Sequence, residues 1–146
     1  MKKVYKTKSV EETQNIAKKL AKEILKKKSA VVIGLQGELG GGKTTFVQGF
    51  AKGLGIKEKI LSPTFIIFKR FSIKDKNFYH FDCYRLQKTK ELLDLGFKEI
   101  ISDPQNIIAI EWADKIKKIM PKKTIWINFK FVNETSRVID ICINYA

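Results

Sequence analysis

The sequence is poor in the residues on which several common kinds of functional site depend. Its 146 residues include two cysteines, Cys83 and Cys142, and one histidine, His80. Two thiols cannot build a disulfide framework, and one histidine without a CxxC pair leaves no Cys/His pattern for zinc. A single histidine also offers no obvious Ser-His-Asp arrangement. The composition therefore excludes a disulfide-stapled scaffold and a zinc-finger type of site.

Long apolar runs are absent as well. No window approaches the about 18 apolar residues that a membrane span needs, and no apolar segment with a cleavage site follows the basic N-terminus. We therefore expect no membrane span and no secretory signal. Two thiols without such a signal fit a reducing compartment, so the expected location is the cytoplasm.

Arginine is scarce although the chain is strongly basic. Only Arg70, Arg85 and Arg137 are arginines among 29 basic residues, and 15 acidic residues leave a formal net charge of +14. Proteins that read nucleic acids often rely on arginine, whose guanidinium makes forked contacts to bases and phosphates. Half of the excess charge lies in residues 1–28. The charge indicates a soluble surface with a general attraction for polyanions, and a basic tRNA- or RNA-binding module is an alternative.

Apolar residues make up 44% of the chain and follow alternating strand and helix patterns. One domain is expected over residues 1–146, because domains of about 100–150 residues are common and no linker or repeat divides the sequence. The patterns predict a strand at 4–5, a helix over 10–28, a buried strand at 30–35, a helix at 45–54, a hairpin of 65–71 and 78–84, short helices at 88–95 and 97–101, a buried strand at 107–110, and a hairpin of 125–132 and 137–143.

The first predicted helix is amphipathic. Ser9 precedes Glu12 by three positions, which is the spacing of a capping box. The apolar face over residues 16–25 is narrow and rich in alanine, which favours a helix packed on a sheet over a basic helix on a membrane surface. Lys26, Lys27 and Lys28 are expected in the last turn, where the helix dipole favours cations.

A glycine-rich segment follows the first buried strand and precedes a predicted helix. Residues 37–44 read Gly-Glu-Leu-Gly-Gly-Gly-Lys-Thr and match the P-loop pattern GxxxxGK(S/T). Glycines let backbone N–H groups point at phosphate oxygens, and the helix start adds its positive end. Lys43 would reach the β- and γ-phosphates, and the Thr44 hydroxyl would bind Mg²⁺. With the order of elements, this motif predicts an α/β, P-loop NTPase-like three-layer sandwich with a mixed parallel and antiparallel sheet.

A P-loop needs an acidic residue at the end of another strand, and two candidates exist. Glu111 follows the apolar run 107–110, as in a Walker B strand, and the alternative is an exposed glutamate at a strand end. Asp82 could orient the attacking water, or could be a structural partner of His80 or Arg85. ATP is the expected nucleotide, because the Asn-Lys-x-Asp segment that recognises guanine is missing.

Three further features could belong to the same site. The turn at Ser62, Pro63 and Thr64 could sense the γ-phosphate, or could simply lead into a strand. Trp112 could pack near the nucleotide or in the core. Arg85 could stabilise transferred charge, contact a partner or form a plain salt bridge. A small-molecule P-loop kinase is a further alternative, but three arginines are too few for the phosphate-clamping lid of such enzymes.

Four motifs in this order resemble the TsaE family of bacterial ATPases of tRNA threonylcarbamoyladenosine biosynthesis. They are Gly37-Glu-Leu-Gly-Gly-Gly-Lys-Thr-Thr45, Ser62-Pro-Thr-Phe65, His80-Phe-Asp-Cys-Tyr-Arg-Leu86 and Glu111-Trp112. The match covers about residues 9–112. It departs from the family pattern at Gly41, where alanine is usual, and at Ala113, where proline is common.

The resemblance implies a P-loop NTPase-like fold and slow ATP hydrolysis by the chain alone. It also implies two partner proteins, a threonylcarbamoyl transferase and its inactive-paralogue companion. The partners modify the adenosine beside the anticodon of tRNAs that read codons beginning with A. The chain would support that complex through its ATP cycle and would meet tRNA through the complex, with no membrane involved.

The resemblance also implies roles for individual residues. Lys43, Asp82 and Glu111 would be catalytic, and Thr44 and Glu111 would hold Mg²⁺. Residues near Val10 to Thr13 would border the adenine. The ATP cradle would consist of Gly40, Gly41, Gly42, Lys43, Thr44 and Thr45.

Overall fold

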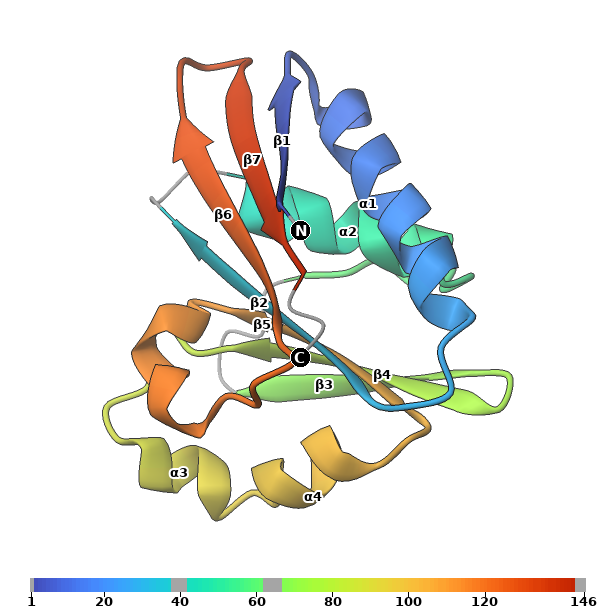
Figure 1. Ribbon diagram of the computed structural model, residues 1–146, viewed down its shortest axis with the longest axis vertical. Coiled ribbons are helices and arrows are strands. Elements are labelled where there is room, and N and C mark those ends of the chain that lie inside the picture. The colour runs from blue at the N-terminus through green and yellow to red at the C-terminus, as the bar shows by residue number, and fades with distance from the viewer. Residues whose placement is uncertain (1, 38–41, 62–66, 144–146) are drawn as a thin grey trace.

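The computed structural model describes residues 2–37, 42–61 and 67–143. Within them, seven strands form one sheet in the order β1-β7-β6-β2-β5-β4-β3 (Figure 1). In chain order the elements are β1 (Lys2–Thr7), α1 (Val10–Leu25), β2 (Val31–Gly37), α2 (Lys43–Gly53), β3 (Phe68–Ile73), β4 (Lys76–Asp82), α3 (Thr89–Leu93), α4 (Phe97–Ser102), β5 (Asn106–Glu111), the 3-10 helix η1 (Ala113–Ile119), β6 (Ile125–Phe131) and β7 (Arg137–Cys142).

The centre of the sheet is parallel and its flanks are antiparallel. β2 pairs in parallel with β5 and β6, and β4 pairs in parallel with β5. β1, β7 and β3 are antiparallel to their neighbours. The predicted α/β class with a mixed sheet is therefore confirmed.

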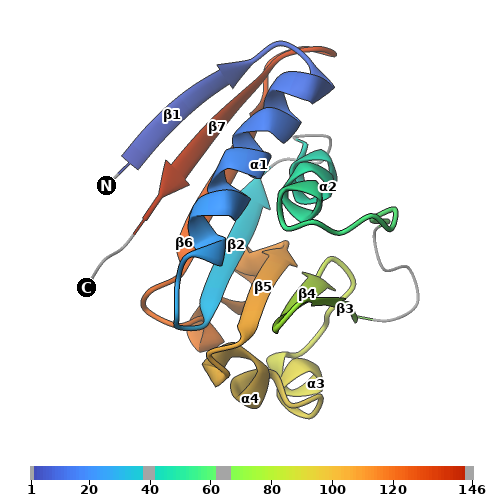
Figure 2. The same ribbon diagram turned by 90° about the vertical axis from the view of Figure 1, so that its right-hand side faces the viewer.

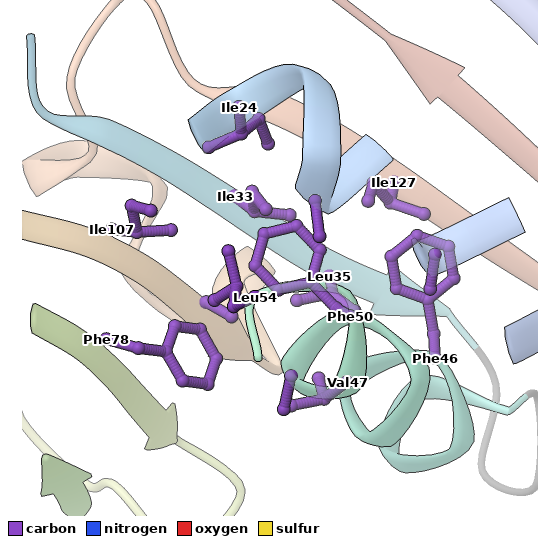
Figure 3. Close-up of a cluster of buried hydrophobic side chains, with 14 of the residues drawn as sticks. Ile24, Ile33, Leu35, Phe46, Val47, Phe50, Leu54, Phe78, Ile107 and Ile127 are labelled. Carbon is purple, nitrogen blue, oxygen red and sulfur yellow. The ribbon is translucent and has the colours of Figure 1, made fainter. Parts of the chain in front are cut away.

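Helices cover both faces of the sheet. Alternate residues of a strand point to opposite faces, so a strand that is apolar throughout needs cover on both sides. Ile107 and Ala109 of β5 pack with α1 and α2, whereas Ile108 and Ile110 pack with α3, α4 and η1. All six β5 residues are buried, as expected for a central parallel strand. Figure 3 shows the larger core, where Phe46 and Phe50 of α2 and Ile24 of α1 meet Ile33 and Leu35 of β2.

The first helix packs on the sheet, as its narrow apolar stripe predicted. Ala17, Ala21 and Ile24 are buried, and α1 lies beside α2 (Figure 2). The Ser9 hydroxyl accepts a hydrogen bond from the Glu12 N–H at 3.1 Å. No helix in the described parts of the chain is both long and apolar enough to cross a bilayer.

The prediction that residues 26–28 form the last turn of this helix is wrong. α1 ends at Leu25, and Lys26 is its C-cap. The Lys26 N–H bonds to the Glu23 carbonyl in a tightened final turn, since the chain must turn back to enter β2 at Val31. Lysine at these positions has a good helix propensity, which is why the sequence pattern extends too far.

The first hairpin is also tighter than predicted. β3 and β4 remain paired from Phe68↔Phe81 to Ile73↔Lys76, so the turn has two residues rather than the predicted 72–77. Lys74 adopts a positive φ of 46° there, and polar residues at the exposed strand ends look like loop residues in the sequence. The sequence pattern gave no sign of η1, because short 3-10 turns lack a clear apolar period.

Candidate functional site

Three parallel strands end together beside the start of α2. Glu111, the last residue of β5, lies opposite Leu35 of β2 on one side and Asp82 of β4 on the other. β2 ends at Gly37, and α2 begins at Lys43. The fold therefore brings Lys43, Asp82 and Glu111 to one edge of the sheet, as the sequence predicted. Gly40, Gly41, Ser62, Pro63 and Thr64 lie outside the described residues.

Gly42 and Lys43 form the transition into α2. Gly42 has a φ of +99°, a left-handed conformation that glycine adopts without steric cost. The turn begins an 11-residue helix, and the first N–H groups of a helix point out of its N-terminus. These groups and the helix dipole can stabilise an anion there.

The side chain of Glu111 is held at both oxygens. The Thr44 hydroxyl donates to Oε1 at 2.8 Å, and Nε2 of His80 lies 2.6 Å from Oε2. Glu111 is only 2% exposed, so the alternative of an exposed glutamate at a strand end is wrong. The contact with His80 was not predicted. The period of two along β4 could have placed His80 and Asp82 on the same face.

Lys43 is buried at the start of α2, with 6% of its surface exposed. Its Nζ donates to the Gly37 carbonyl at 3.0 Å and lies 4.1 Å from the centre of the Trp112 ring. Burial lowers the pKa of Lys43, and attraction to Glu111, Asp114 and Asp82 opposes that shift. A partly desolvated ammonium of this kind would gain much from an anionic oxygen.

Asp82 is half-buried at the end of β4. Burial raises the pKa of Asp82, while a hydrogen bond from the Tyr84 N–H to Oδ1, 3.0 Å long, opposes the shift. The nearby charge of Glu111 adds to the increase. The hydrogen bond of His80 Nε2 is with Glu111. This contact argues against the alternative in which Asp82 is a structural partner of His80. A raised pKa makes the Asp82 carboxylate a better proton acceptor than an ordinary aspartate.

Trp112 packs in the core, which is one of the two environments expected from the sequence, and it also contacts a residue of the candidate site. It packs against the core beneath α3 and α4, and its ring also contacts Lys43 and lies 5.1 Å from Tyr84. Its φ of 58° is unusual for a bulky residue, and strained backbone of this kind concentrates at functional sites. Arg85 is exposed on the segment after Asp82 and has no ion pair among residues that the structure describes.

A cavity of about 330 Å³ lies beside the start of α2. The beginning of α1, the start of α2 and the turn between β6 and β7 line this cavity. The sequence did not predict that this turn would contribute, because it lies some 90 residues from the P-loop motif. Its lining residues are Lys8, Ser9, Val10, Glu11, Thr13, Gly42, Thr45, Glu134, Thr135 and Arg137.

Comparison with known proteins places this geometry in a family. The family described as "Threonylcarbamoyl adenosine biosynthesis protein TsaE" matches residues 7–139. The tRNA threonylcarbamoyladenosine biosynthesis protein TsaE of Bacillus subtilis is 38% identical over 135 residues, which cover 92% of this chain and 82% of that protein. The Rickettsia felis protein of the same name is 36% identical, with 92% of this chain and 76% of the relative covered.

A solved structure agrees with the sequence comparisons. The crystal structure of Bacillus subtilis YdiB superposes with a TM-score of 0.75 at 31% identity, and the match covers 98% of this chain and 86% of that one. Both the fold and the sequence therefore support the same assignment. The chain belongs to the TsaE family of tRNA threonylcarbamoyladenosine biosynthesis proteins.

Proposed function

We propose that this chain is a Mg²⁺-dependent ATPase that supports the complex adding threonylcarbamoyl to the adenosine beside the anticodon of tRNA. The observation that carries the proposal is the 2.8 Å contact between the Thr44 hydroxyl and the Glu111 carboxylate. It joins the P-loop helix to the carboxyl end of β5, where a P-loop ATPase holds its metal.

The phosphates of ATP would lie at the start of α2. Lys43 supplies a cation there, and Gly42 starts a helix whose N-terminal N–H groups can bind an anion. Gly40 and Gly41 would complete the cradle. The cavity beside Thr45, bordered by Val10 and Thr13, would receive the base and sugar.

The donor oxygens fit Mg²⁺. Neighbouring ligands of an octahedral Mg²⁺ lie about 2.9 Å apart, since each is 2.0–2.1 Å from the metal. The Thr44 and Glu111 oxygens are 2.8 Å apart. Across the described residues no cluster of three or more His, Cys, Asp or Glu could hold a metal alone. Mg²⁺ does not require such a cluster, because it usually takes one or two carboxylates and completes its shell with phosphate oxygens and water. The bound metal would neutralise charge on the phosphates.

Asp82 would orient the water that attacks the γ-phosphate and accept a proton at its carboxylate. Its half-buried position and raised pKa support that role. The attacking hydroxyl would form the new bond to phosphorus, and ADP would leave with the electrons of the broken bond.

The activity would serve a complex rather than a free enzyme. We propose as partners a threonylcarbamoyl transferase and its inactive-paralogue companion, with tRNA reached through them in the cytoplasm. The family assignment supports this proposal. This chain would not form the threonylcarbamoyl bond itself.

Reconstitution tests the proposal. The chain is mixed with the two partners, tRNA, threonylcarbamoyl-adenylate and ATP, and repeated turnover is measured. Lys43→Ala is expected to abolish nucleotide binding or turnover, and Glu111→Ala to abolish hydrolysis, each by about 10²-fold or more.

Two other results would contradict the proposal. Unchanged turnover in both variants would indicate a basic RNA-binding protein with a vestigial P-loop. A phosphorylated metabolite formed from ATP would indicate a small-molecule kinase.

A further inference from the structure

The carboxylate of Glu111 has a buried partner that the proposed hydrolysis does not use. Nε2 of His80 lies 2.6 Å from Oε2, on the side of the carboxylate opposite Thr44. His80 is 1% exposed, and Glu111 is 2% exposed. Both side chains are shielded from bulk water, so the contact between them restricts where each one lies.

We propose that His80 is a positioning residue, which holds one oxygen of Glu111 so that the other faces Thr44 and the metal. This inference rests on the proposed function. His80 would touch neither nucleotide nor metal and would act only through Glu111.

The register of the sheet explains how the two side chains meet. His80 pairs with Ala109, and Asp82 pairs with Glu111, so His80 lies diagonally across from Glu111 on the same face. The 2.6 Å distance from Nε2 to Oε2 shows that the two long side chains span this diagonal. Ala109, the residue directly opposite His80, has a short side chain that does not fill the space between His80 and Glu111.

The direction of the hydrogen bond follows from the chemistry of the partners. As a metal ligand in the proposed site, Glu111 would be ionised and would only accept hydrogen bonds, so the Nε2–H of His80 would donate to Oε2. The Thr44 hydroxyl donates to Oε1. With Oε2 occupied, Glu111 presents a single oxygen to the site. Outer partners of metal-binding groups usually orient them in this way, and their loss costs about 10–100-fold in metal affinity or activity.

A matched pair of amide variants tests the role of His80. The side chain of glutamine places its amide nitrogen near the position of Nε2, whereas that of asparagine is too short to reach Glu111. Binding of a fluorescent ATP analogue is measured in EDTA and then during titration with Mg²⁺. His80→Asn is expected to raise the half-saturating Mg²⁺ concentration about tenfold or more, and His80→Gln to stay within about threefold of the parent protein.

The EDTA measurement separates metal binding from general damage. Affinity without metal is expected to change less than about threefold in both variants, because the phosphate cradle on α2 does not include His80. Equal metal dependence in the parent protein and His80→Asn would overturn the inference. An equal defect in both amide variants would overturn it too, since the glutamine retains the donor.

A spectroscopic measurement tests the inference even if the His80→Asn variant fails to fold. His80 is the only histidine of the chain, so the ¹⁵N spectrum of untagged protein reports on this ring alone. We expect a slowly exchanging Nε2–H whose signal shifts on addition of Mg²⁺ with the ATP analogue, and whose parent position is lost in Glu111→Gln. A ring protonated only at Nδ1, or a signal that ignores Glu111→Gln, would overturn the inference.

The controls distinguish this inference from the proposed function. If the parent protein and Thr44→Ala bind the analogue with the same dependence on Mg²⁺, the metal site itself is wrong. If Thr44→Ala loses that dependence and His80→Asn keeps it, only the role of His80 is wrong.

Discussion

Single residues at the site differ from their ordinary chemistry because they are partly removed from water. Burial disfavours the charged form of a side chain, so it raises the pKa of Asp82 and lowers the pKa of Lys43. The free protein therefore bears a cost for keeping both groups charged. A bound polyphosphate would offset that cost at Lys43, and hydrolysis would use the stronger basicity of Asp82.

Asp82→Asn is expected to separate activity from stability. Asparagine retains the Oδ1 acceptor for the Tyr84 N–H but cannot accept a proton, so hydrolysis should fall about 10²-fold or more. The raised pKa means that the folded state of the parent binds the Asp82 proton more tightly than the unfolded state. The contribution of Asp82 to the stability of the parent therefore declines as pH rises from the ordinary pKa of 3.8 through the raised pKa.

The variant lacks that decline. Its Tm should equal or exceed that of the parent protein at pH 7, and the difference should vanish at pH values below 3.8. Thermal melts across pH and a phosphate-release assay check both parts. A lower Tm at pH 7 together with full hydrolysis would show that Asp82 is a structural residue.

Loss of the charge of Lys43 should weaken nucleotide binding at alkaline pH. Its pKa lies below the ordinary 10.5, so the free protein loses this charge earlier than an ordinary lysine would. Affinity for ATP should fall as pH rises through the lowered pKa, with proton uptake on binding in that range. Lys43→Arg should bind ATP more weakly, but its affinity should not fall over this pH range, because arginine keeps its charge. Calorimetry in two buffers measures the proton uptake. No proton uptake, together with the same pH profile of ATP affinity in the parent protein and in Lys43→Arg, would contradict the prediction.

At the scale of elements, the P-loop helix is held in place by its close approach to α1. A Cβ atom added at Gly49 would lie 2.5 Å from the Cα of Gln14, and one at Gly53 would lie 2.8 Å from the Cα of Lys18. These glycines therefore let the two helix backbones meet. Because α2 begins with Lys43 and Thr44, its position on α1 also positions the site.

Gly49→Ala should lower stability although alanine is the better helix former. The gain in helix propensity is about 1 kcal/mol, but the methyl group would meet backbone atoms that cannot move aside, at a cost of about 1–3 kcal/mol. We expect a lower Tm and a weaker affinity for ATP. Lys22→Ala on the exposed face of α1 is the control and should change stability by less than about 0.5 kcal/mol. A more stable Gly49→Ala protein would show that the helices separate at little cost.

At the scale of the whole molecule, the net charge of +14 acts independently of the site. Exposed lysines occur on most elements, whereas Lys43 is buried. A dispersed positive charge attracts a polyanion without orienting it. Such attraction is compatible with a partner that carries tRNA, and it supplies no specificity.

The free chain should therefore bind tRNA weakly and with a strong dependence on salt. Affinity should fall at least about tenfold between 50 and 200 mM salt, and ATP should not change it. Replacing Lys26, Lys27 and Lys28 by glutamate should weaken tRNA binding and leave ATP binding intact, and Lys43→Ala should do the reverse. Filter binding across salt concentrations measures both. Tight binding that ignores salt would point to a specific RNA site.

The order of motifs along the chain was enough to predict which residues would meet at the end of the parallel strands. The P-loop pattern predicted Lys43 and Thr44, and the apolar run before Glu111 predicted the facing carboxylate. Both are local signals, because each lies within one strand or one strand-to-helix turn. For the same reason the central strands and both long helices were found with small errors at their ends.

Only the tertiary structure decided which distant segments meet. β2 lies between β5 and β6, which follow it by some 70 to 90 residues, and no local pattern encodes that order. The contact of His80 with Glu111 depends on the register of β4 against β5, and the wall of the cavity at Glu134–Arg137 depends on how β7 pairs with β6. The sequence by itself determined the chemical groups of the site, and long-range pairing determined their partners, because packing free energy is shared among residues far apart in the chain.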